Sequence, residues 1–276
     1  MSRELKPIFK CRAGKIAAGR GQYMAEEEKV TKKTSVAFGI LKWGGITAGV
    51  LVLAAAVFIL PMARTMMSFR PAPTGAVTPE FFAVNNKFVD FFVFKSGDEL
   101  FCFDAGNSVA QVLEGFKELG LEPSKVKAVF LTHSDGDHVN GLPAFVNAAV
   151  YLPAAEEPLV TGTKKRHFMF MERINTLPVL KYTLIKDGER VKIGKGVCEA
   201  ILTPGHTIGS TSFLVNGKYL IVGDLAIIKN GKLIAMPKPP SEDPVTVGES
   251  LKKAESIKGV EYVATAHAGV LKIPGN

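Results

Sequence analysis

THSDGDH, residues 132–138, directly follows the apolar run AVFL, which we expect to be a strand. Four of its seven residues have side chains that bind metals: His133, Asp135, Asp137 and His138. Imidazole nitrogen and carboxylate oxygen are typical ligands of borderline divalent cations. In an extended loop the alternating residues point the same way, and His138 adds a second direction. The stretch therefore predicts a site for one or two cations, and a polar turn capped by Asp is the alternative.

Three later stretches repeat this arrangement of a polar side chain at the end of an apolar run. They are LTPGHT with His206, IVGD with Asp224, and VATAHAG with His267. Pro204 and Gly205 restrict the backbone just before His206. Each stretch is ordinary singly, because an Asp at a strand end is commonly a cap. Their recurrence in this order, in a chain with five histidines, makes the set specific.

The surrounding chain alternates strand-like and helical patterns, with turn signals such as Asn216-Gly217 between strand-like runs. We expect strands over 88–95, 99–103, 128–131, 149–152, 197–202, 212–215, 219–222 and 262–264. We expect helices over 108–119, 141–146 and 244–257. This order of elements predicts an α/β or α+β sandwich, and composition alone goes no further.

These motifs resemble those of the metallo-β-lactamase superfamily over roughly residues 80–273. The family signature His-x-His-x-Asp-His here has Asp135 at the second histidine. The resemblance implies an α+β fold, a four-layer α/β/β/α sandwich with the metals at one edge of the sheets. It also implies that Asp104 supports the loops rather than binding metal.

The resemblance implies two divalent ions. One would take His133, Asp135 and His206, the other would take Asp137, His138 and His267, and Asp224 would bridge them. Zinc is the expected metal. The carboxylate of Asp135 is harder than imidazole, so manganese or iron would also suit that position.

The implied activity is that of a metal-dependent hydrolase. A metal-bridging hydroxide would attack an ester, thioester, lactone or phosphodiester bond, and Asp137 would be catalytic by orienting it and relaying its proton. Major β-lactamase classes of the family have cysteine where Asp224 stands, so a true β-lactamase is not expected. The substrate is expected to be a small or lipid-like molecule.

Two other functions fit parts of the pattern. A membrane-tethered binding or scaffold module could keep a vestigial site, although the full ligand set speaks against this. The carboxylate at Asp135 would suit a diiron redox protein, but no electron-relay domain is expected after His267. The run Lys164–Arg166 could attract an anionic substrate, but a solvated charge run is the default reading. We expect His167 to be solvated as well.

An uncharged segment of 21 residues, 43–63, predicts one transmembrane helix, because about 30 Å of hydrocarbon needs about this length. The alternative is a buried core helix. We expect a basic, disordered tail over 1–42, a linker over 64–79 and the hydrolase domain over 80–276. Lysines are concentrated before the span, which favours an uncleaved signal-anchor with a cytoplasmic N-terminus and an extracytoplasmic domain.

The charge distribution speaks against nucleic acid as a partner. Residues 1–70 hold 12 Lys and Arg against 4 Asp and Glu, whereas residues 71–276 hold 22 of each. A binder of phosphate backbones would place its excess charge on the folded domain. Three cysteines are too few for a disulfide framework. We expect Cys102 and Cys198 to be buried free thiols, and a single bridge between them is the alternative.

Overall fold

The computed structural model describes residues 13–168 and 171–274 of the chain. The chain divides into two units, residues 1–60 and residues 61–276, and each is considered by itself. The longest element, α1 (Ala13–Ser68), begins in the first unit and ends in the second. All candidate ligands belong to the second unit.

The described part of α1 is longer than the expected span. It includes residues 13–42, for which the sequence predicts no regular structure, whereas residues 1–12 lie outside the described residues. Ala, Lys and Glu make up 13 of these 30 residues, and all three favour helix. The Lys32 ammonium and the Glu28 carboxylate lie 3.4 Å apart, one turn from each other. The dispersed charges of residues 13–42, which suggested disorder in the sequence, therefore lie on a helix in the structure.

Residues 43–63 of α1 form a helical segment that is apolar on all sides. The Thr47 hydroxyl donates a hydrogen bond back to the Trp43 carbonyl oxygen. Trp43, Leu51 and Ile59 are exposed. By length and composition, α1 is the one described helix that could cross a membrane.

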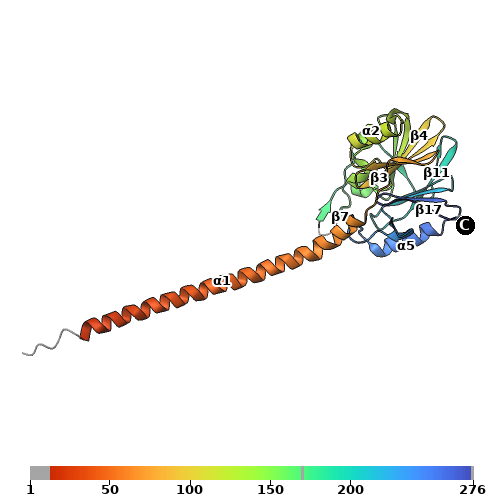
Figure 1. The fold of residues 1–276 in the computed structure, drawn as a ribbon. Helices are drawn as coiled ribbons and strands as arrows, with labels where there is room; N and C mark the ends of the chain where they lie inside the picture. Colours follow the sequence, from red (N-terminus) through yellow and green to blue (C-terminus); the bar gives the residue numbers. More distant parts are fainter. Residues whose placement is uncertain (1–12, 169–170, 275–276) are drawn as a thin grey trace, which may run out of the picture. The chain divides into compact units, whose positions relative to one another are not determined.

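The second unit contains two mixed β-sheets (Figure 1). The first has the order β1-β2-β3-β4-β5-β6-β9, with bounds β1 Gly75–Thr78, β2 Phe81–Asn86, β3 Val89–Ser96, β4 Glu99–Phe103, β5 Val126–Phe130, β6 Ala149–Pro153 and β9 Thr183–Ile185. The second has the order β10-β11-β12-β13-β16-β17, with bounds β10 Arg190–Ile193, β11 Gly196–Leu202, β12 Thr211–Val215, β13 Tyr219–Gly223, β16 Tyr262–Thr265 and β17 Gly269–Lys272. The pairs β4–β5, β5–β6, β6–β9 and β13–β16 are parallel.

Two short hairpins and several helices complete this unit. The hairpins pair β7 (Arg166–Phe168) with β8 (Met171–Arg173), and β14 (Ala226–Lys229) with β15 (Lys232–Ala235). The helices are α2 (Val109–Glu118), α3 (Gly136–Val139), α4 (Glu157–Val160) and α5 (Pro244–Glu255), with 3₁₀ turns η1 (Pro123–Lys125) and η2 (Leu142–Ala144). The expected helix over 141–146 is thus only a 3₁₀ turn, because Gly141 and Pro143 disfavour an α-helix.

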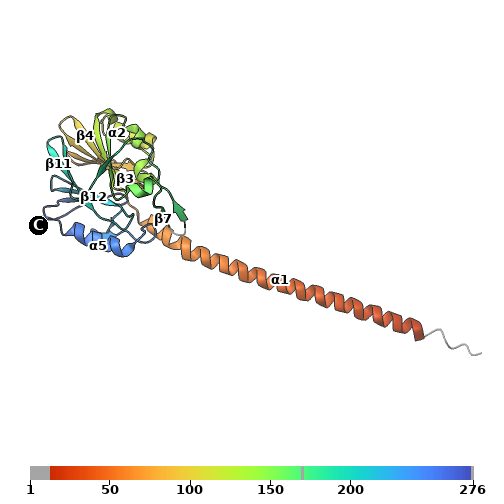
Figure 2. The same ribbon diagram turned by 180° about the vertical axis from the view of Figure 1, so that it is seen from behind.

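Three hydrophobic clusters separate four layers. The central cluster lies between the sheets and joins Phe92 and Phe103 of the first to Phe213 of the second. A second cluster packs α2 against the first sheet, and a third packs α5 against the second sheet. Figures 1 and 2 show α2 and α5 on opposite sides of the paired sheets. The predicted α/β/β/α sandwich is therefore confirmed.

Residues 64–79 are not a free linker. α1 continues to Ser68, and β1 joins the first sheet through β2. Between them, the Ala72 amide donates to the Asp90 carboxylate at 2.7 Å, and the Asn85 side-chain amide donates to the Ala72 carbonyl at 2.9 Å. The prolines of this segment limit its regular structure but do not prevent it from packing on the domain.

Cys102 and Cys198 are free and buried, as the sequence indicates. Burial raises the pKa of both thiols well above its usual range. Cys11 lies outside the described residues.

Candidate metal centre

The first loop follows β5, and Asp104 at the end of β4 holds it in place. One oxygen of Asp104 accepts from the Thr132 amide at 2.7 Å, and the other accepts from the Thr132 hydroxyl at 2.8 Å and lies 2.9 Å from His138 Nδ1. A carboxylate on Nδ1 directs Nε2 of the same ring toward the site. Asp104 thus supports the loop, as the family resemblance implies.

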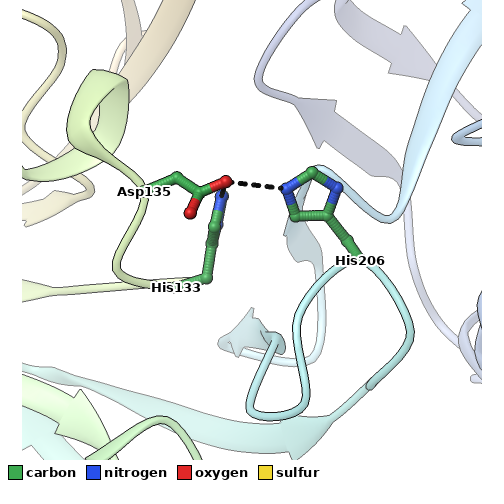
Figure 3. A group of neighbouring side chains, drawn as sticks. All are labelled: His133, Asp135 and His206. Atoms are coloured by element: carbon green, nitrogen blue, oxygen red, sulfur yellow. Dashed lines mark ion pairs between the residues drawn. The ribbon is translucent and has the colours of Figure 1, made fainter. Parts of the chain in front are cut away.

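His133, Asp135 and His206 form the first group of potential ligands. Figure 3 shows their side chains converging from two different loops. Asp135 Oδ2 lies 3.4 Å from His206 Nε2 and 3.9 Å from His133 Nε2. All three side chains are buried. One ligand atom from each lies within 4.8 Å of the others, which suits a single cation.

The second group consists of Asp137, His138 and His267, and its ligand atoms also lie within 4.8 Å of one another. Asp137 Oδ2 lies 3.8 Å from His138 Nε2 and 3.6 Å from His267 Nε2. His267 Nδ1 is 2.7 Å from the Phe88 carbonyl oxygen, so it donates there and leaves Nε2 directed into the site.

Asp224 lies between the two groups at the end of β13. Its Oδ1 is 3.3 Å from His138 Nε2 and 3.2 Å from His267 Nε2, while its Oδ2 is 3.4 Å from His206 Nε2. The two oxygens of one buried carboxylate thus face different groups. This is the arrangement that a shared ligand requires.

The hydrogen-bonding of the buried donor atoms fits a cation. Among the described residues, His133 Nε2, His138 Nε2 and Asp224 Oδ1 are buried without a hydrogen-bond partner. An unpartnered buried polar atom costs about 1–3 kcal/mol, and three in one place call for a ligand. All three face the centre of the site, so the residues fit the metal that the fold implies.

The buried histidines and carboxylates of the centre shift one another's pKa values. Burial lowers the pKa of His133 well below its usual range, and the neighbouring His138 and His206 add to this. Its imidazole is therefore neutral and free to bind metal. Burial opposes the charge on His138, but Asp104, Asp137 and Asp224 outweigh it and raise its pKa well above normal. Burial also works against ionised Asp224, yet the surrounding histidines lower its pKa well below its usual range. The ligand cluster thus favours a bound positive charge.

Glu156 is a buried carboxylate that sequence reasoning missed. It accepts from the Ser134 amide at 2.9 Å and the Ser134 hydroxyl at 2.6 Å in the first loop. It also accepts from the Thr207 hydroxyl at 2.7 Å and the Gly209 amide at 3.1 Å in the second loop. A Cβ on Gly209 would lie 2.2 Å from the Glu156 nitrogen, so only glycine permits this approach. Glu156 therefore fixes the two histidine loops to each other.

Glu156→Ala is expected to lower the free energy of unfolding by about 2–4 kcal/mol, because four buried donors lose their common acceptor. The neighbouring variant Glu157→Ala is the matched control and should change stability by less than about 1 kcal/mol. Thermal unfolding of the full chain in detergent measures both. Equal unfolding midpoints for the two variants would contradict the role assigned to Glu156.

Arg166 is the second residue that sequence reasoning misplaced. The solvated charge run expected for Lys164–Arg166 holds for the two lysines, which are exposed, but is wrong for Arg166, whose side chain is 0% exposed. Its guanidinium Nη2 lies 3.1 Å from Asp135 Oδ2 and 3.3 Å from His206 Nε2. In β7 the side chain turns inward, whereas that of His167 is exposed.

Two further groups contact the same carboxylate. Arg173 Nη2 lies 3.0 Å from Asp135 Oδ1, and the Asn175 side-chain amide donates to that oxygen at 3.0 Å. Burial works against ionised Asp135, but His206, His133 and Arg166 outweigh it and lower its pKa well below normal. Asp135 is thus ionised and pairs with two arginines, Arg166 and Arg173.

The fold and this donor set define a metal-binding protein of the metallo-hydrolase class. The family model described as the metallo-beta-lactamase superfamily matches residues 85–267. The chain therefore belongs to the metallo-β-lactamase superfamily, and the family resemblance seen in the sequence is confirmed.

Several curated relatives bear names from the same class. A probable metallo-hydrolase of Methanocaldococcus jannaschii is 31% identical over 58% of this chain and 66% of its own length. A probable metallo-hydrolase of Bacillus subtilis is 27% identical over 49% of this chain and 64% of its own length. Ribonuclease Z of Latilactobacillus sakei is 27% identical over 62% of this chain and 56% of its own length. The chain thus spans just under two thirds, or less, of the length of these relatives.

Solved structures show the same fold. A metallo-β-lactamase of Cronobacter sakazakii has a TM-score of 0.57 at 22% identity, over 74% of this chain and 81% of that one. A subclass B3 metallo-β-lactamase of Bradyrhizobium japonicum has a TM-score of 0.56 at 20% identity, over 72% of this chain and 79% of that one.

Proposed function

We propose that the protein is a membrane-anchored hydrolase that works with two divalent ions. The observation that carries this proposal is the convergence of unpartnered, buried donor atoms of His133, His138 and Asp224. One ion would be held by His133, Asp135 and His206, the other by Asp137, His138 and His267, and Asp224 would contact both. Zinc is the metal expected first, with manganese or iron as alternatives at the Asp135 position.

Divalent ions in such a site lower the pKa of water and polarise a carbonyl or phosphoryl oxygen. Asp137 is the catalytic residue among the ligands. Its side chain is 25% exposed, whereas those of His138 and Asp224 are 0% and 5% exposed, so it is the most accessible of the three to water. We assign it to orient the attacking water and to pass its proton to the leaving group. The bond cleaved would be an ester, thioester, lactone or phosphodiester.

The name ribonuclease Z among the relatives raises RNA as a substrate. The domain does not favour this, because residues 71–276 carry equal numbers of basic and acidic side chains. β-Lactam hydrolysis is not proposed either, because Asp224 stands where major lactamase classes of the family have cysteine. No partner protein is proposed.

Metal analysis combined with a panel of hydrolase substrates tests the proposal. We expect two divalent ions per chain and hydrolysis of at least one model thioester, lactone, ester or phosphodiester. Removal of metal by a chelator should abolish that hydrolysis, and zinc should restore it. A chain that binds no divalent ion, or binds it without hydrolysing any substrate of the panel, would favour the binding or scaffold alternative.

The N-terminus is proposed to be cytoplasmic and the domain extracytoplasmic, because lysines precede the apolar segment. Ser124, an exposed residue of η1, is a suitable reporter. In a Cys11→Ser background, Ser124→Cys is expected to react with a membrane-impermeant maleimide in intact cells. The Cys11→Ser parent is the control, because its two remaining thiols are buried. Labelling of Ser124→Cys only after permeabilisation would reverse the topology.

A further inference from the structure

A pocket of about 300 Å³ opens onto the metal centre and has two chemically different sides. Candidate ligands, among them Asp135, Asp224 and His267, form the polar side. Five large apolar side chains also belong to the lining: Met62, Met66, Phe69, Phe88 and Phe168. A small polar substrate would not bury these apolar side chains. We therefore expect a ligand with an apolar part that packs against them.

The last turns of α1 supply this apolar wall. Met62, Thr65, Met66 and Phe69 follow the spacing that places residues on one face of a helix. Thr65 is buried, and its hydroxyl lies 3.4 Å from the Pro239 carbonyl oxygen. This end of α1 is therefore docked on the domain.

The chain directly after α1 contacts a candidate ligand. The Phe69 ring stacks on the His267 ring, with centroids 4.1 Å apart and planes at 10°. The Arg70 amide donates to the His267 carbonyl oxygen at 2.7 Å. The apolar wall and the metal centre are thus in direct contact.

The same residues connect the pocket to the predicted membrane span. Met62 belongs both to the apolar segment 43–63 and to the pocket wall. Five residues lie between Ala63 and Phe69, and six steps at the helical rise correspond to about 9 Å. The headgroup layer of one leaflet is about 5–8 Å thick. If residues 43–63 span the bilayer, this short connection keeps the pocket within reach of the lipid headgroups.

We propose, on the basis of the hydrolase function above, that the substrate is a membrane amphiphile with an acyl or alkyl chain. Its apolar chain lies along Met62 and Met66, and its ester or phosphodiester bond reaches the metal centre. Water gives its oxygen to the acyl or phosphoryl centre and one proton to the departing alcohol oxygen. The second proton leaves with the acid product. Arg173, whose side chain is half-exposed beside Asp135, faces an anionic headgroup at the pocket.

Binding of two phosphonates tests this proposal without relying on turnover. The full-length, zinc-loaded protein in nanodiscs of diether phosphocholine is titrated calorimetrically with methylphosphonate and with hexylphosphonate. Hexylphosphonate is expected to bind at least about tenfold more tightly, as burial of about two methylene groups would give. Met66→Ser should reduce this ratio to about threefold or less.

Met67→Ser is the matched control, because Met67 lies on the same helix, is 73% exposed and is not part of the pocket lining. It should keep the ratio of the wild type, which removes simple partitioning into the bilayer as an explanation. Equal affinities for the two phosphonates, no binding of either, or equal ratios in Met66→Ser and Met67→Ser would overturn the proposal. If the proposed hydrolase function is wrong, the substrate panel described above will show no hydrolysis, and this result does not depend on the phosphonate titration.

Discussion

Asp224→Ala is expected to reduce bound metal from two ions per chain to one or none and to abolish hydrolysis. Asp224 is the only candidate ligand whose two oxygens face both groups, through His206 on one side and His138 and His267 on the other. Without Asp224, both groups of ligands lose a negatively charged oxygen that would hold the ions. A loss of at least about 10²–10³-fold in rate is expected, as for removal of one preorganised electrostatic group.

Elemental analysis of the purified variant, together with its rate on the substrate that the wild type cleaves best, measures both effects. Asp98→Ala removes an exposed carboxylate from the turn between β3 and β4 and serves as the control. It should keep both ions and the wild-type rate. Two ions per chain and near-normal hydrolysis in Asp224→Ala would show that this carboxylate does not bridge the metals.

Asp135→His is expected to shift metal preference towards zinc and to destabilise the protein. The histidine restores the common family pattern and removes a hard oxygen ligand. It also removes the Asp135 partner of the buried Arg166 guanidinium, which lies at 3.1 Å, and leaves Glu242, also at 3.1 Å, as its remaining carboxylate, so the loss should be at the lower end of the range for a broken buried pair. Breaking a buried ion pair from one side costs about 3–5 kcal/mol. Adding Arg166→Met should recover only part of this loss, because Glu242 then loses its own partner at 3.1 Å, and it should keep the preference for zinc.

Thermal unfolding and reconstitution with zinc or manganese measure these effects. Glu199→Gln, which breaks the exposed Arg190–Glu199 pair, is the control and should cost less than about 1 kcal/mol. Identical metal preference in Asp135→His and wild type would show that Asp135 does not bind the ion. In that case Asp135 would serve only to pair with Arg166 and Arg173.

The parts of the site visible in the sequence are those that follow strands directly. His133, Asp224 and His267 each come after an apolar run, and the ends of neighbouring strands meet at one edge of a sheet. Their convergence could therefore be predicted. The assignment of individual ligands to two ions stays a prediction that metal analysis can test.

The residues missed by sequence reasoning act through partners that are distant in the chain. Glu156 looks like part of a polar helix start, and Arg166 looks like the end of a charged run. Nothing near them in sequence reveals that Gly209 approaches Glu156, or that Asp135 faces Arg166. Burial of a charged side chain depends on tertiary packing, which local patterns do not report.

The secondary-structure elements also divide into those that the sequence predicts and those that it does not. The helix expected over 244–257 is observed as α5, because Asp243 caps it and Pro244 suits its first turn. The strands β1, β9, β10 and β17 were not expected, since each has only three or four residues and mixes polar with small or apolar ones, and β2 was not expected although its first four residues are apolar. These strands are stabilised by pairing with neighbouring strands and not by the β-propensity of their own residues.

The wide separation of the ligands along the chain has a consequence for folding. His133 follows β5 of the first sheet, whereas His267 follows β16, which pairs in parallel with β13 of the second. Parallel pairings between distant segments form late, because closing a long loop costs entropy first. Asp224, which follows β13, therefore meets His267 only after β13 and β16 have paired. Metal capture should be the closing step of maturation, and the captured ions stabilise the finished fold over every earlier intermediate.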